Sequence, residues 1–277
     1  MRVDDNTKSI KWQSRHTRLG NLRFFLRYNG GVPWIYLSPH FDDVALSCGG
    51  LVWEQTKSSE DVSIWTVCAG KPPAGEISPF ALELHTRWEV NQNASAQRRI
   101  EDKNSCRRLG ARSRYFSIPD CIYRRHPRTG EFLYASEAAL NGPLHPGDTK
   151  VIHTLQEVLK RSLQPNVVLV CPLGLGTHVD HQLTRLAVEG LGRTVWYYAD
   201  FPYVLHRKAL VKQMEQEGWI SQVFPVSQEG LVAWQDSISA HGSQISTFWD
   251  SDLTMKQAVV KYLHWYDGIR LWRMPAS

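Results

Sequence analysis

Residues 34–57, WIYLSPHFDDVALSCGGLVWEQTK, contain the pattern that decides the fold. The short apolar run Trp34–Leu37 predicts a buried strand, and Val44–Lys57 has the spacing of a helix. The polar tetrapeptide His40-Phe41-Asp42-Asp43 lies between them, so it follows the strand and opens the helix. Ligands of open α/β sheets bind in the crevice beyond the carboxyl ends of the strands. We therefore expect this tetrapeptide to lie at a binding site.

Beyond this stretch, short β-branched runs keep alternating with longer segments of helical periodicity. The alternation predicts an α/β protein with a Rossmann-like, doubly wound, mostly parallel sheet and helices on both faces. We expect one domain over residues 31–277, an N-terminal extension over residues 1–30 and an irregular loop over residues 119–147. Further strands are expected at Val62–Cys68, Tyr115–Ile118, Val167–Cys171 and Val195–Ala199, and helices at Phe80–Trp88, Ala94–Leu109, Thr149–Leu163, Asp180–Gly192, Glu229–Ala240 and Leu253–Tyr266.

A second polar motif, His178-Val179-Asp180-His181, follows the apolar run Val167–Cys171 across the turn Gly174-Leu175-Gly176 and opens a helix. The two strand-end loops together offer three histidines and three aspartates to one crevice. Zinc prefers imidazole and carboxylate ligands, and a catalytic site keeps one position for water. Two histidines and one carboxylate meet that need, and the same set also serves non-haem iron(II). The sequence therefore predicts one divalent metal per chain, with zinc favoured and Fe2+ left open.

The remaining polar residues of the two motifs suit the hydrolysis of an amide or ester. A metal-bound water needs a base that takes its proton, and the oxyanion and leaving nitrogen need a donor. Asp42, adjacent to Asp43, suits the first role. His178, near His181 and with Asp180 to orient and charge its ring, suits the second. The structural alternative is that the aspartates cap helices and that His178 with Asp180 forms a capping turn.

The bulk properties favour a soluble protein of a reducing compartment. The net charge of +5 is small and scattered, so neither nucleic acid nor an anionic membrane is indicated as a partner. Five cysteines without a CxxC pair do not suggest a disulfide framework. The N-terminal MRVDDNTKSIKWQ lacks the apolar core of a signal peptide, and no apolar run approaches the roughly 20 residues that cross a bilayer. We expect a cytoplasmic protein and leave association into a homo-oligomer open.

At these motifs the sequence resembles the LmbE-like or PIG-L N-acetylglucosaminyl deacetylases. The first family motif has the form (A/S)HPDDE, and Ser38–Val44 is similar to it; the second, HxDH, is present intact at 178–181. The resemblance covers residues 34 to 273, nearly the whole chain. Its other matching segments are Gln97–Asp102 followed by Leu109-Gly110, Tyr198–Tyr203 (YADFPY), Ser243-Gln244 and Gly268–Arg273 (GIRLWR).

The resemblance implies an LmbE-like deacetylase domain over residues 31–277. The implied enzyme uses zinc to remove an N-acyl group, most often acetyl, from a small-molecule amino sugar or sugar conjugate. The resemblance implies zinc ligands at His40, Asp43 and His181, with Asp42 as the general base. It implies that His178 steadies the oxyanion or protonates the amine.

Candidates for substrate contacts follow with less support from the motifs. The resemblance makes Arg99 a candidate to bind substrate, with a solvated helix face as the alternative, and Asp120 a candidate to bind a sugar hydroxyl. Trp65, Trp88 and Tyr123 lie in or near strand-end loops and are candidates to stack on a sugar ring. The acyl group and the acceptor are not specified by these residues.

Two positions depart from the family pattern. Phe41 replaces the usual proline, and Val44 replaces the usual glutamate, which removes an acid near the metal but no ligand. The departures leave open a metal amidase that acts on a non-sugar amide. A catalytically idle sugar-binding relative is the alternative of another class, and it would be expected to have lost one of the motif residues.

Overall fold

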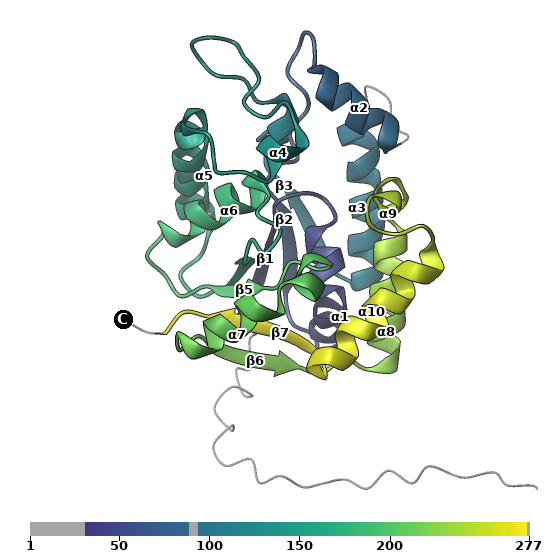
Figure 1. The fold of residues 1–277 in the computed structure, drawn as a ribbon. Coiled ribbons are helices and arrows are strands. Elements are labelled where there is room, and N and C mark those ends of the chain that lie inside the picture. The colour runs from purple at the N-terminus through teal and green to yellow at the C-terminus, as the bar shows by residue number, and fades with distance from the viewer. Residues whose placement is uncertain (1–30, 89–93, 276–277) are drawn as a thin grey trace, which may run out of the picture. The chain divides into compact units, whose positions relative to one another are not determined.

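A sheet of seven strands runs through the described part of the chain (Figure 1). The computed structural model describes residues 31–88 and 94–275, so the extension expected over residues 1–30 lies outside the described residues. The strand order is β3-β2-β1-β4-β5-β7-β6. The first five strands are parallel, and β7 is antiparallel to both β5 and β6. The strands are β1 (Trp34–Ser38), β2 (Val62–Thr66), β3 (Arg112–Tyr115), β4 (Val168–Pro172), β5 (Trp196–Tyr198), β6 (Ile220–Phe224) and β7 (Ile269–Arg273).

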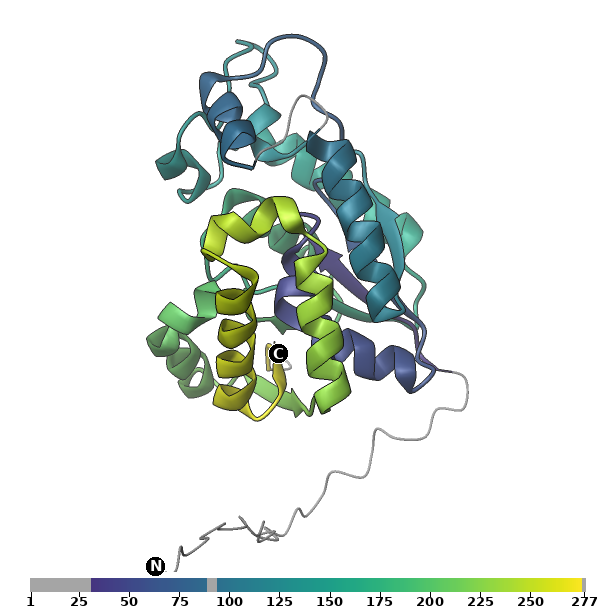
Figure 2. The ribbon, with the colours of Figure 1, turned by 90° about the vertical axis from the view of Figure 1, so that its right-hand side faces the viewer.

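Helices cover both faces of this sheet, as the alternation of the sequence predicted. Helices α5 and α6 lie on one side of the sheet, and α1, α3, α8 and α10 lie on the other (Figure 1). Figure 2 shows α8 and α10 next to each other, with α1 and α3 beside α8. The α-helices are α1 (Asp43–Lys57), α2 (Pro79–Arg87), α3 (Ala94–Leu109), α4 (Glu137–Leu140), α5 (Thr149–Ser162), α6 (Val179–Glu189), α7 (Lys208–Gln216), α8 (Gln228–Ser239), α9 (Gly242–Phe248) and α10 (Asp252–Tyr266). Short 3-10 helices are η1 (Cys121–Tyr123), η2 (Pro146–Asp148) and η3 (Tyr203–His206).

The unit β1–α1 is anchored at the centre of the sheet. Strand β1 pairs with β2 on one side and β4 on the other, so its apolar side chains are buried on both faces. Gly49 and Gly50 let α8 approach α1 closely, because a Cβ on Gly49 would lie 2.5 Å from Trp234. The Trp234 indole then donates to the Ala45 carbonyl at 2.8 Å. The start of α1, which carries the first motif, is thereby held in a fixed place.

Three parts of the predicted topology need correction. The third strand is Arg112–Tyr115, not Tyr115–Ile118, because this strand lies at the sheet edge and alternates exposed arginines with half-buried residues. The antiparallel pair β6–β7 and helices α7 and α9 were not predicted. The expected loop over residues 119–147 contains η1 and α4 and ends in η2. Within the described ranges, none of the helices is both long and apolar enough to span a bilayer.

Candidate active site

The two sequence motifs meet at the carboxyl ends of neighbouring strands. Strands β1 and β4 pair in parallel with Trp34 opposite Val168, so the loops that follow them leave the sheet at the same edge. His40, Asp42 and Asp43 from the first loop and His178 and His181 from the second line one cavity of about 120 Å³. The predicted convergence of the two motifs is therefore present in the structure.

The Asp43 carboxylate lies between the two predicted histidine ligands. Its Oδ2 is 3.3 Å from His40 Nδ1, and its Oδ1 is 3.3 Å from His181 Nε2. The backbone N–H of His40 also donates to Asp43 Oδ2 at 2.7 Å, which fixes the carboxylate within the loop. Nitrogen atoms of His40, His178 and His181 lie within 4.8 Å of one another. His178 is thus close enough to His40 and His181 to bind the same metal or to act on a substrate held there.

Asp200, two residues after the end of β5, contacts the His181 ring on the side opposite Asp43. It was not predicted as a site residue. Its Oδ1 lies 2.5 Å from His181 Nδ1, while Oδ2 accepts the backbone N–H groups of Gly174 at 2.7 Å and Leu175 at 2.9 Å. His181 Nδ1 donates its proton to this carboxylate, which turns Nε2 toward Asp43. A carboxylate that orients a histidine in this way is usual at metal sites.

The backbone before the second motif aims His178 into the cavity. Thr177 has a φ of 62°, a left-handed conformation that a β-branched residue rarely adopts. Its hydroxyl donates to the Asn141 carbonyl at 3.0 Å, and Gln182 Nε2 donates to its carbonyl at 2.5 Å, so side chains on both sides hold the turn. His178 then caps α6, with its Nδ1 accepting the Asp180 N–H at 3.2 Å. A neutral His178 therefore carries its proton on Nε2.

The Asp180 carboxylate does not orient His178, contrary to the prediction. It lies 3.0 Å from His40 Nε2 and accepts the Cys121 N–H at 3.1 Å. Its other oxygen accepts from Arg124 at 2.5 Å. Only the backbone N–H of Asp180 bonds to the His178 ring. The Asp180 carboxylate therefore contacts His40 on one side and Arg124 on the other.

Arg124 continues this buried network away from the cavity. The guanidinium is 4% exposed and binds Asp148 at 2.9 Å as well as Asp180. Tyr134 donates to the same Asp148 oxygen at 2.7 Å. Arg124 is thus the guanidinium that pairs with two fully buried carboxylates, and the sequence had not indicated it as a site residue.

Of the two adjacent arginines on α3, Arg98 lines the cavity and the predicted Arg99 does not. Arg98 donates to Asp42 Oδ1 at 3.0 Å and lies 3.7 Å from Asp120. Arg99, about 100° further round α3, donates to the Ala69 carbonyl instead, and its guanidinium lies over Tyr115. Arg99 is not among the described residues that line the cavity, whereas Asp120 lines it as expected.

Of the three aromatic residues predicted to stack on a sugar ring, one lines the cavity and two do not. Trp88 lines the cavity, together with Tyr203 and Phe248. Trp65 packs in the core near Phe116, and the Tyr123 hydroxyl is 2.6 Å from His85 Nε2, so neither is among the described lining residues.

Burial and neighbouring charges set the protonation of the cluster. Burial disfavours a charged His40, but the hydrogen bonds to Asp180 and Asp43 raise its pKa well above the usual range. Burial also disfavours a charged His181, but Asp43 and Asp200 raise its pKa to about 10. Burial, followed by the neighbouring His40, lowers the pKa of His178 well below its usual value. His178 is accordingly the neutral imidazole of the three.

The charge of the cluster favours a bound cation. Two buried guanidinium groups and the two imidazoles of raised pKa, His40 and His181, face five carboxylates, those of Asp42, Asp43, Asp120, Asp180 and Asp200. Imidazole and carboxylate groups are the ligands that zinc and similar divalent metals prefer. Both the donor set and the surplus of negative charge therefore fit a divalent metal held by these residues.

The PIG-L family, described as GlcNAc-PI de-N-acetylase, matches residues 35–191, more than half of the chain and both motifs. The chain belongs to the PIG-L family. This membership confirms the resemblance seen in the motifs and the prediction of an N-deacetylase-type hydrolase.

Two curated relatives and a solved structure are similar to this PIG-L protein. It is 30% identical over 203 residues to the 2′-N-acetylparomamine deacetylase of Niallia circulans, a match that covers 67% of this chain and 71% of that protein. It is 29% identical over 188 residues to the protein of the same name from Streptomyces fradiae, covering 64% of this chain and 59% of that relative, less than two thirds of its length. The zinc-inhibited form of teicoplanin deacetylase superposes with a TM-score of 0.73 at 22% identity, covering 88% of this chain and 100% of that one. This last likeness confirms the predicted α/β fold.

Proposed function

We propose that this PIG-L protein is a zinc-dependent N-deacetylase that hydrolyses the N-acetyl amide of an amino sugar or sugar conjugate. The observation that carries the proposal is the convergence of five motif residues, His40, Asp42, Asp43, His178 and His181, in one cavity. The names of the two curated relatives support an acetylated amino sugar as the substrate class.

Within this proposal, His40, Asp43 and His181 hold the metal. Asp180 and Asp200 orient the two imidazoles by contacts of 3.0 and 2.5 Å. When bound, zinc supplies a Lewis acid that polarises the acetyl carbonyl and lowers the pKa of a water molecule.

The proton transfers fall to Asp42 and His178. Asp42 takes the proton of the attacking water while Arg98 holds its carboxylate at 3.0 Å. His178 presents its Nε2 proton, since Nδ1 accepts a backbone N–H. That proton stabilises the oxyanion of the tetrahedral intermediate and suits transfer to the departing nitrogen. The C–N bond breaks, and the products are acetate and the free amine.

The rim of the cavity supports a sugar as the acceptor. Trp88, Tyr203 and Phe248 provide aromatic faces of the kind that pack on sugar rings. Asp120, 3.7 Å from Arg98, is placed to accept a hydrogen bond from a hydroxyl group. Arg87 and Glu137, on α2 and α4, form an ion pair of 3.7 Å and also line the cavity. These residues are proposed to contact the part of the substrate beyond the acetamido group.

The cell compartment and the assembly are part of the same proposal. All five cysteines are free and buried, which supports the predicted reducing, cytoplasmic location. A small-molecule partner is proposed, without nucleic acid or membrane, and a homo-oligomer stays a prediction.

Metal analysis combined with an amine-release assay tests this function. We expect about one zinc per chain and release of free amine from a panel of N-acetylated amino sugars, alongside N-acetylated non-sugar amines. Asp42→Ala should abolish turnover but keep the metal, because Asp42 is not a proposed ligand. The matched Asp61→Ala removes an exposed carboxylate on the loop before β2 and should keep both. Full activity of Asp42→Ala would refute the assigned base. A metal-loaded protein that cleaves only the non-sugar amides would refute the sugar acceptor.

A further inference from the structure

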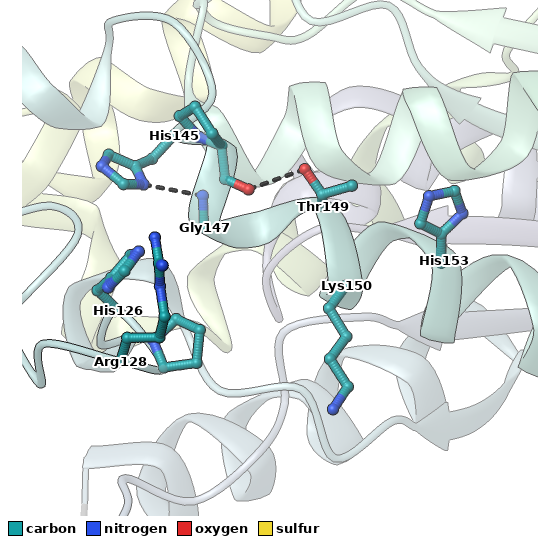
Figure 3. Close-up of a pocket in the computed structure, with 9 residues that line it drawn as sticks. His126, Arg128, His145, Gly147, Thr149, Lys150 and His153 are labelled. Carbon is teal, nitrogen blue, oxygen red and sulfur yellow. Dashed lines mark hydrogen bonds between the residues drawn. The ribbon is translucent and has the colours of Figure 1, made fainter.

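A second hollow, separate from the active site, opens beside the N-terminal end of α5. It is a groove of about 520 Å³ between the turn at 126–128, the turn at 145–147 and the first turns of α5 (Figure 3). None of its lining residues is among the described residues that line the active-site cavity. The side chains that matter here are His126, Arg128, His145, Lys150 and His153. The groove is thus a distinct feature that the proposed deacetylation does not use.

Local turns fix the protons of two imidazoles in this groove. His145 Nδ1 accepts the Gly147 N–H at 3.0 Å, and His126 Nδ1 accepts the Thr129 N–H at 3.2 Å. A nitrogen that accepts a hydrogen bond carries no proton, so each neutral ring has its proton on Nε2. The two ring centroids are 6.0 Å apart. Both rings therefore offer N–H donors, and neither has a free lone pair with which to bind a transition metal.

Cationic side chains add to these donors without acidic neighbours. Figure 3 shows the Arg128 side chain beside the His126 ring and directed toward Gly147, while Lys150 and His153 follow on the first turns of α5. No aspartate or glutamate is among the described lining residues. Asp148 is adjacent in sequence, but its carboxylate is buried and bound to Arg124 and Tyr134. Glu131, two residues after Thr129, accepts a hydrogen bond from the Thr129 hydroxyl at 3.0 Å.

We propose that this groove binds a phosphoryl oxyanion, such as a phosphate ester or a diphosphate. The groove offers hydrogen-bond donors from two imidazole N–H groups, a guanidinium and an ammonium. Such a set does not suit a cation or a neutral ligand with few acceptor atoms. A phosphate ester or a diphosphate offers more acceptor oxygens than a carboxylate, so its oxygens can be shared among donors spread around the groove. The N-terminal end of α5 adds the positive end of a helix dipole. This inference does not depend on the proposed deacetylase activity.

Calorimetric titration with inorganic pyrophosphate at low salt tests the proposal. The double variant Arg128→Ala/Lys150→Ala removes both cations from exposed positions and should leave the fold intact, as checked by thermal unfolding. Its pyrophosphate affinity should fall by at least about tenfold, because the variant loses two cationic donors to the phosphoryl oxygens. The matched control is Lys160→Ala/Arg161→Ala, which removes two exposed cations from the last turn of α5. Acetate, with only two oxygens, should bind much more weakly than pyrophosphate.

The same variants distinguish a soluble ligand from a lipid headgroup. Co-sedimentation with phosphatidic acid vesicles that is lost in the groove variant would also support the phosphoryl site and would assign the lipid as its source. No binding of either probe to the unmodified chain would overturn the proposal. An equal loss in the groove variant and in the control would overturn it too, because net charge alone would then explain the binding.

Discussion

Asp102 on α3 gives a quantitative prediction about stability and pH. The carboxyl group is 2% exposed and accepts a hydrogen bond from the Tyr115 hydroxyl at 2.6 Å and a weak one from Cys106 at 3.8 Å. Burial raises its pKa to about 7, although these two hydrogen bonds and Arg99 act in the opposite direction; the nearby Asp42 raises it further. The folded protein therefore keeps Asp102 protonated at pH values where the unfolded chain ionises it.

The sign and size of the effect follow from the two pKa values. An unfolded aspartate titrates near pH 3.9, about three units below the folded value, and each unit corresponds to about 1.4 kcal/mol. The contribution of Asp102 to stability is complete below about pH 4 and is lost as the pH rises to about 7. This loss amounts to about 4 kcal/mol. Asp102→Asn cannot ionise and keeps an acceptor for Tyr115, so the stability of the variant relative to the unmodified protein should rise by that amount across the same range.

Urea unfolding followed by tryptophan fluorescence at several pH values measures this difference. Both proteins should be stripped of metal first, since metal binding carries its own pH dependence. Asp61→Asn is the control, because the Asp61 carboxylate is exposed and pairs with Arg112 at the surface; its effect should change little with pH. A difference between Asp102→Asn and the unmodified protein that is constant from pH 4.5 to 8 would refute the reasoning and show that Asp102 is ionised in the fold.

Three further predictions concern buried groups around the cavity. Asp200→Asn removes the anionic acceptor of His181 Nδ1 and should weaken metal affinity by about 10- to 100-fold in competition with a chelating dye; unchanged affinity would contradict the orienting role. Arg124→Met leaves Asp180 without its cation and should lower the free energy of unfolding by about 3–5 kcal/mol, measured by urea unfolding. Burial lowers the pKa of His241 to about 4, so its contribution to stability is lost as the pH falls from about 6.5 to 4, by about 3 kcal/mol. His241→Gln should remove this acid sensitivity, and an unaltered pH profile would exclude His241 as its source.

The motif residues could be predicted because each motif is short and attached to a buried strand. His40 and Asp43 follow β1, His178 and His181 follow β4, and the parallel pairing of these strands brings both loops together. The local spacing is enough to place such residues once the strands are recognised. Their roles as ligands and catalytic groups remain the proposal made above.

The residues that support the motifs could not be predicted in this way. Asp200 is 19 residues from its partner His181. Arg98 is 56 residues from Asp42, and Arg124 is 56 residues from Asp180. Each is a single residue whose function depends on tertiary contacts and not on a local pattern. The choice between Arg98 and Arg99 depends on the rotation of α3, and its very polar sequence, ASAQRRIEDKNSCRRL, does not show which side faces the core.

The two departures from the family motif have different consequences in the structure. The Phe41 ring lies 5.6 Å from the Arg98 guanidinium, so a residue that replaces proline packs against the group that holds Asp42. Val44 is buried, and its N–H donates to the Ser38 hydroxyl at 3.2 Å. The Val44 side chain packs in the apolar core and is not among the described residues that line the cavity, so an acid at this position would place a charge among apolar side chains. The carboxylates that form hydrogen bonds with the proposed imidazole ligands from outside the motif positions Asp42 and Asp43 are those of Asp180 and Asp200.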